Sequence, residues 1–121
     1  MSKISIRKIA SSIKFANQGL RSFFKDDPKS WLHITAAILV VILGFILEVT
    51  RMAWLILVLC IGLVFAAEIF NSAIEKLCNK VEPNIDPQIK IIKDLAAAAV
   101  WTLSLTAAII GCIIFWEKIA Q

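Results

Sequence analysis

Three stretches of the sequence, residues 31–47, 53–67 and 95–116, carry no Asp, Glu, Lys or Arg and are almost wholly apolar. A helix needs about 20 such residues, with a range of about 17–25, to cross the hydrocarbon core of a bilayer. The second stretch is shorter, but its helical pattern continues through Glu68 to Leu77. The sequence therefore predicts an all-α membrane protein of one domain, residues 1–121, with spanning helices at about 29–48, 52–78 and 88–117.

The composition supports a membrane environment. Hydrophobic residues make up 60% of the chain, against about 45–50% in a typical soluble domain. Basic residues gather in the first 29 residues and again between residues 76 and 93. Because no large polar domain carries this charge, we expect an anionic membrane surface as its partner and no nucleic acid. The three cysteines form no CxxC pattern, and we interpret them as packing residues.

The segment from about residue 3 to residue 25 differs from the three spans. Ile9, Ile13 and Leu20 alternate with Lys and Arg at partly helical spacing, which is typical of an amphipathic helix lying in the membrane interface. A solvated N-terminal helix is the alternative. With three spans, the basic N-terminus and the basic 76–93 region share one side. The positive-inside rule makes that side the cytoplasmic face of the cell membrane.

The end of the second span interrupts its apolar character with Glu68, Asn71 and Glu75, at spacing i, i+3, i+7. This spacing places the three side chains on one face of a helix. Glu68 lies roughly 10 Å deeper than Glu75, below the headgroup level. A carboxylate at that depth is a functional-site candidate, suited to a general base or a proton-handling group. The alternative, polar contacts between helices, applies above all to Asn71.

A second polar cluster opens the third span with Lys90, Lys93 and Asp94. Ordinary anchoring in the interface explains such residues. Together with Glu75, however, they can bind a divalent cation and phosphates. The residues alone therefore indicate a polar site at the cytoplasmic membrane surface that handles a phosphate, a metal or a proton.

Four segments then resemble one family. "AEIFNSAIEKLCN" (67–79) resembles the E-x-x-N-[ST]-A-[IV]-E signature of the small prokaryotic integral-membrane lipid kinases, which include diacylglycerol kinase and undecaprenol kinase. "KFANQGL" (14–20), "LHI" (32–34) and "KIIKDLAAAAV" (90–100) are similar to further segments of that family, in the same order. The resemblance implies a surface helix plus three spans, assembled as a homotrimer with active sites shared between subunits.

The resemblance also implies a reaction, the transfer of the γ-phosphoryl group of ATP to the hydroxyl of a membrane lipid, with Mg²⁺. Diacylglycerol, giving phosphatidic acid, is the favoured substrate, and undecaprenol is the alternative. An inactive relative or a small proton-coupled membrane protein is the non-kinase alternative. The cluster of Lys93, Asp94 and Glu75 speaks against that alternative, because a proton-coupled transporter has no use for a phosphate-binding surface.

Carried over position by position, the resemblance implies a role for each matching residue. Glu68 matches the catalytic carboxylate, and Asn71 and Ala97 match residues that support the active site. The residues that match ATP-binding positions are Lys8, Phe15, Asp27, Glu75, Lys93 and Asp94, of which Glu75 and Asp27 also match Mg²⁺ ligands. Asp27 stands where the family usually has Glu and is followed by Pro28, so Asp26 is an alternative metal ligand.

Overall fold

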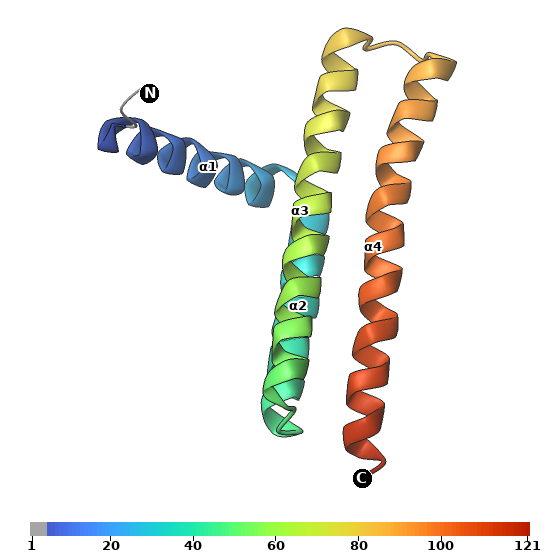
Figure 1. The fold of residues 1–121 in the computed structure, drawn as a ribbon. Helices are drawn as coiled ribbons and strands as arrows, with labels where there is room; N and C mark the ends of the chain where they lie inside the picture. Colours follow the sequence, from blue (N-terminus) through green and yellow to red (C-terminus); the bar gives the residue numbers. More distant parts are fainter. Residues whose placement is uncertain (1–4) are drawn as a thin grey trace.

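The structure is a computed structural model that describes residues 5–121, and every regular element in that range is an α-helix. The helices are α1 (Ile6–Asp26), α2 (Lys29–Ile46), α3 (Arg51–Val81) and α4 (Pro87–Ile119) (Figure 1). The expectation of an all-α chain with three long apolar helices is confirmed. Residues 3 and 4, which the expected first helix includes, lie outside the described range.

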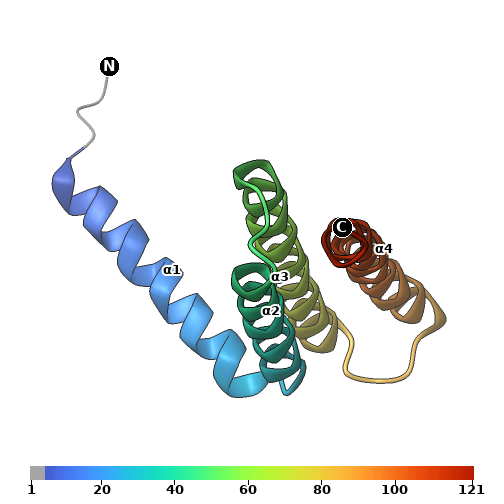
Figure 2. The ribbon, with the colours of Figure 1, turned by 90° about the horizontal axis from the view of Figure 1, so that it is seen from below.

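The three long helices lie side by side, whereas α1 runs out from them to one side (Figure 1). In the view of Figure 2, α1 and α4 lie on opposite sides of the pair formed by α2 and α3. α3 is the central element, because it contacts each of the other three helices. A side chain on α3 can therefore meet residues from all parts of the chain.

The connection between α1 and α2 is only two residues long. Pro28 resists continuation of α1, and α2 begins at the next residue. Ser30 is fully buried there, and its backbone N–H and its hydroxyl both donate to the carbonyl of Asp27, at 3.1 and 2.6 Å. These bonds fix the corner, and Asp27 is thereby held between the two helices.

A tight hairpin joins α2 to α3 at the other end of the molecule. Gly44 is buried, and a Cβ atom placed on it would lie 2.6 Å from the ring of Trp54. The Trp54 ring also packs on Phe45, with ring centroids 4.8 Å apart. Glu48 adopts a left-handed conformation, φ 50°, which turns the chain. The side chain of Thr50 then caps α3 by accepting from the backbone N–H of Ala53 at 3.2 Å.

The apolar surfaces of α2, α3 and α4 face outward. Within the most apolar 18-residue window of each helix, only 11%, 11% and 6% of the residues are buried. Such exposed apolar surface is costly in water, and all three helices are long and apolar enough to cross a bilayer. The chain is therefore a multi-pass membrane protein, and lipid or other protein chains cover these surfaces.

Candidate functional site

Glu68 is the most deeply placed carboxylate of α3, and only 3% of it is exposed. One of its oxygens, Oε1, lies 3.0 Å from Nε2 of His33, which α2 contributes. The other oxygen, Oε2, is buried and has no hydrogen-bond partner among residues 5–121. An unsatisfied buried carboxylate oxygen is costly. Residues 5–121 therefore leave this buried oxygen of Glu68 unpaired.

Asn71 and Glu75 follow Glu68 on the same face of α3. Asn71 is 3% exposed, and its amide nitrogen donates to Oε1 of Glu75 at 3.4 Å. Its amide oxygen is buried without a partner in the described part of the chain. Glu75 is half-buried. The stripe predicted from the spacing is present, with Glu68 and Asn71 enclosed and Glu75 nearer to the surface.

Asp27 is brought against α3 by the corner between α1 and α2. The hydroxyl of Ser72 donates to its Oδ2 at 2.7 Å, and the backbone N–H of Lys29 donates to its Oδ1 at 2.9 Å. Asp27 and Glu75 both line a polar cavity of about 250 Å³ between this corner and α3. Two carboxylates that lie 48 positions apart in the sequence thus meet in one space.

Asp26, the alternative metal ligand, is engaged elsewhere at the rim of this cavity. It accepts from Nζ of Lys76 at 3.1 Å and from the hydroxyl of Ser22 at 3.2 Å. Both hydrogen bonds lower the pKa of the Asp26 carboxyl, and the one from Lys76 has the larger effect. Asp27, in contrast, accepts only from uncharged donors among residues 5–121. Its negative charge is not neutralised by a lysine of that range, so Asp27 is the better candidate to bind a cation.

Lys93 lies where α4 meets the end of α3. Its Nζ donates to Oδ1 of Asn79 at 2.6 Å, and Asn79 lines the polar cavity. The structure therefore brings Lys93 to the edge of the cavity. Asp94, its neighbour in sequence, is exposed and pairs with Lys90 on its own helix, at 2.6 Å.

The single chain leaves Lys8, Phe15 and Ala97 apart from this cluster. Lys8 lies in the first turn of α1, at the opposite end of that helix from Asp27. Phe15 is 66% exposed, and Ala97 on α4 is also exposed. α1 runs away from the three long helices (Figure 1). Within this chain, Lys8 therefore does not join the cluster.

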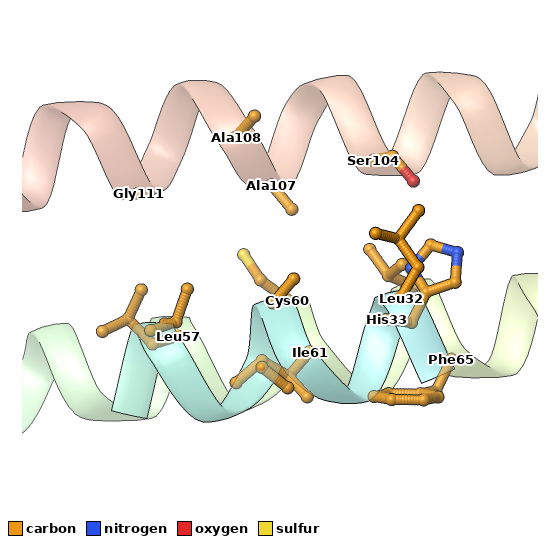
Figure 3. A pocket seen from close by; sticks show the side chains of 14 residues that line it. Leu32, His33, Leu57, Cys60, Ile61, Phe65, Ser104, Ala107, Ala108 and Gly111 are labelled. Atoms are coloured by element: carbon orange, nitrogen blue, oxygen red, sulfur yellow. The ribbon is translucent and has the colours of Figure 1, made fainter. Parts of the chain in front are cut away.

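On the membrane side of Glu68 lies an apolar groove of about 380 Å³ between α2, α3 and α4. Figure 3 shows Leu57, Ile61 and Phe65 on one side of the groove and the segment of α4 with Ala107, Ala108 and Gly111 on the other. His33 lines the same groove from α2. Along α3, Glu68 follows the groove residues 57–65 and precedes the cavity residues 72–79. It therefore stands between an apolar space and a polar one.

Comparison with known proteins decides the family. The family model of prokaryotic diacylglycerol kinase matches residues 14–115 of this chain. The chain belongs to the prokaryotic diacylglycerol kinase family. The family predicted from the four sequence segments is thus confirmed, and with it the predicted enzyme class, a lipid kinase.

Individual relatives within the family carry two names. The chain is 32% identical to undecaprenol kinase of Bacillus subtilis (strain 168) over 114 residues, which cover 94% of this chain and 93% of the relative. It is 27% identical to diacylglycerol kinase of Escherichia coli (strain K12) over 110 residues, which cover 91% and 90%. Diacylglycerol kinase of Haemophilus influenzae is also 27% identical, over 109 residues that cover 89% and 92%. The likeness extends over nearly the whole length of each protein.

A kinase of this family needs a place for the phosphates of a nucleotide donor. Residues 5–121 contain no group of three or more His, Cys, Asp or Glu side chains that can hold a metal ion by themselves. Mg²⁺, however, is usually bound by one or two carboxylates together with substrate phosphates and waters. Asp27 and Glu75, in one cavity, supply such a pair, so the residues present fit the ion.

Sequence reasoning missed three side chains that the structure adds to the site. His33, Ser72 and Asn79 contact Glu68, Asp27 and Lys93, respectively. Ser72 and Asn79 lie within the "AEIFNSAIEKLCN" segment, so proximity to the motif was an available signal. His33 lies 35 positions before Glu68 in the sequence. Its signals were its place in the family-like segment "LHI" (32–34) and its rarity, because it is the sole histidine of the chain.

Proposed function

We propose that the chain transfers the γ-phosphoryl group of ATP to the hydroxyl of a membrane lipid, with diacylglycerol as the acceptor. The observation that carries this proposal is the position of Glu68 between the polar cavity and the apolar groove. A lipid substrate is apolar except at its head, and the phosphoryl donor is highly charged. A carboxylate at the junction of the two spaces suits a reaction between such partners.

In this proposal Glu68 is the general base. It takes the proton of the lipid hydroxyl, whose oxygen attacks the γ-phosphorus while ADP leaves. Asn71 supports the site by bridging toward Glu75, as its 3.4 Å hydrogen bond suggests. Ala97, on α4, belongs to the supporting residues through the family resemblance alone. Phosphoryl transfer depends mainly on positioning and on neutralising charge, so few residues suffice.

The nucleotide phosphates lie in the polar cavity in this proposal. Glu75 and Asp27 hold Mg²⁺, which when bound offsets the charge of the phosphates. Lys93 adds a positive charge at the edge of the same cavity. Asp94 is its proposed partner in contacting the nucleotide and has to leave its pair with Lys90 to do so.

Lys8 and Phe15 complete the ATP site from a neighbouring subunit of a homotrimer. Two observations support this assembly. The apolar faces of α2–α4 are mostly unburied in the single chain, and α1 carries Lys8 away from its own cavity (Figure 1). We also propose that α1 is amphipathic and lies on the cytoplasmic face of the cell membrane, with the N-terminus on that side, because Lys and Arg are frequent in this segment.

Undecaprenol is the second candidate acceptor. The observation that favours it is the 32% identity to the Bacillus subtilis undecaprenol kinase, against 27% to the diacylglycerol kinases. Both acceptors present a hydroxyl on a long apolar body, so the proposed mechanism is the same for either.

The acceptor is tested with the purified wild-type protein in mixed micelles that contain radiolabelled ATP and Mg²⁺. Diacylglycerol and undecaprenol are supplied in separate reactions. We expect label in diacylglycerol. Label in undecaprenol alone would show that undecaprenol is the acceptor of the same phosphoryl transfer. Label in neither lipid would contradict the proposed function.

A further inference from the structure

Glu68 pairs with His33, a residue that has no role in the reaction proposed above. Nε2 of His33 lies 3.0 Å from Oε1 of Glu68. Only 4% of the Glu68 side chain and 18% of the His33 side chain are exposed. An ionised carboxylate accepts hydrogen bonds and donates none. Nε2 therefore carries the hydrogen, and it donates to Oε1.

The two oxygens of Glu68 are thereby made unequal. Oε1 is occupied by the histidine, whereas Oε2 is buried and without a partner among the described residues. A carboxylate held by one oxygen has a defined orientation, because rotation about its last bond would break the hydrogen bond. The unpaired oxygen, Oε2, is the one with a lone pair free to accept a proton from a substrate hydroxyl.

We propose that His33 is a positioning residue that holds Glu68 with Oε2 directed at the acceptor hydroxyl. This proposal rests on the proposed function. In the step that it describes, the O–H bond of the lipid breaks and its proton passes to Oε2. The hydroxyl oxygen forms a bond to the γ-phosphorus of ATP, and the bond from that phosphorus to the bridging oxygen breaks and releases ADP. His33 keeps its own proton throughout.

The place of His33 in the fold fits this role. α2 contributes it to the wall of the apolar groove (Figure 3), and its ring also meets the ring of Phe65 edge-on, with centroids 6.1 Å apart. Packing against Phe65 and the bond to Glu68 together fix the imidazole ring. The histidine thus ties the base on α3 to a second helix, at the membrane side of the reacting centre.

Substitutions of His33 separate this role from simple helix packing. Leu removes the donor, whereas Gln places an amide N–H near the position of Nε2 and Asn places one near that of Nδ1. A misplacement of about 1 Å at a reacting group costs about 100-fold in rate. We therefore expect His33→Leu and His33→Asn to lose about 100-fold in kcat, with the KM for ATP unchanged, and His33→Gln to retain most of the activity.

The matched control is Thr35→Val, which lies on the same helix. The Thr35 hydroxyl donates to the backbone carbonyl of Trp31, whereas the hydrogen bond to Glu68 comes from His33. We expect this variant to keep the wild-type kcat. Thermal unfolding of every variant in detergent shows whether a loss of activity merely follows a loss of folded protein.

A spectroscopic measurement tests the pair without activity. His33 is the only histidine in the chain, so ¹⁵N-histidine labelling gives the signals of one ring. We expect the spectrum of the wild type to show the hydrogen on Nε2, and Glu68→Ala to shift the Nε2 resonance. An Nε2 resonance that does not respond to Glu68→Ala would overturn the pair itself.

The kinetic outcomes separate the two proposals. An active wild type with a folded His33→Leu variant of unchanged kcat would overturn the positioning role and leave the proposed function standing. A loss in His33→Gln as large as that in His33→Leu would overturn it as well, because the donor would then not be what matters. A folded wild type that labels neither lipid would overturn the proposed function and the role of His33 with it.

Discussion

At the scale of the residue, the site consists of carboxylates whose surroundings differ. Glu68 is enclosed and has one oxygen unpaired within residues 5–121, Glu75 is half-buried beside an amide, and Asp27 is held by two uncharged donors. Chemically similar groups are therefore suited to different roles. The deepest carboxylate, Glu68, is suited to accepting a proton, and the two that share the polar cavity are suited to binding a cation.

Removal of the charge of Glu75 tests its assignment to the metal. We expect Glu75→Gln to raise the Mg²⁺ concentration needed for half-maximal activity by at least about tenfold, as loss of even an outer partner of a metal ligand does. The measurement is a titration of activity with Mg²⁺ at fixed ATP. The control is Glu82→Gln, a carboxylate beyond the end of α3 that caps its own turn. An unchanged titration for Glu75→Gln would count against Glu75 as a ligand.

Ser72 gives a more specific test of Asp27. Its hydroxyl fixes Oδ2 of Asp27 at 2.7 Å, so Ser72→Ala leaves the carboxylate less well oriented. We expect the Mg²⁺ affinity of the Ser72→Ala variant to fall about 10- to 100-fold. The Mg²⁺ affinity of Ser72→Thr, which keeps a hydroxyl, should fall much less. Equal Mg²⁺ affinity in the Ala variant and the wild type would show that Asp27 does not hold the ion through this arrangement.

At the scale of the element, the helices could be predicted from the apolar stretches of the sequence. The contacts between the helices could not. The spans were expected at about 29–48, 52–78 and 88–117, and the helices run over Lys29–Ile46, Arg51–Val81 and Pro87–Ile119. The shared face of Glu68, Asn71 and Glu75 on α3 could also be predicted from the sequence, because helical periodicity is a local property. These features require only the order of residues along one segment.

Contacts between elements could not be obtained from the sequence in the same way. The meeting of Asp27 with Ser72 depends on the corner that Ser30 fixes between α1 and α2. The meeting of His33 with Glu68 depends on how α2 packs on α3. No local pattern encodes such packing, so these partners became visible only in the structure.

The hairpin between α2 and α3 sets that packing and can be tested at Gly44. Its missing side chain makes room for the Trp54 ring, which cannot move freely because Phe45 packs on it. We expect Gly44→Ala to destabilise the protein by about 1–3 kcal/mol, as overpacking does. Thermal unfolding in detergent measures this, with Gly62→Ala as the control because a Cβ there meets nothing within 4 Å. Equal unfolding of the two variants would contradict the close packing.

At the scale of the whole molecule, one chain holds only part of the proposed site. Glu68, Glu75, Asp27 and Lys93 gather at or beside the polar cavity. Lys8 and Phe15 remain on a helix that leads away from it (Figure 1). The outward apolar faces of the three spans give neighbouring copies a surface on which to pack.

Mixing of two inactive variants tests whether sites are shared between subunits. Lys8→Ala and Glu68→Gln are each expected to be inactive alone. When equal amounts are unfolded together and reassembled at random, about a quarter of the sites of a symmetric oligomer pair an intact Glu68 with an intact Lys8 from its neighbour. We expect activity to return to that extent. A mixture as inactive as its two components would place both residues in one subunit's site.

The role of Glu68 as the general base is tested by comparing the Glu68→Gln protein with the wild type in two assays. One assay measures transfer of labelled phosphate to lipid, and the other measures binding of ATP with Mg²⁺. Because Glu68 acts on the lipid proton and lies outside the cavity for the nucleotide, we predict that transfer falls by about 10²- to 10⁴-fold, the usual contribution of a general base, while ATP affinity stays that of the wild type. Retained transfer, or loss of ATP binding in the folded variant, would contradict the assignment of Glu68 as the base.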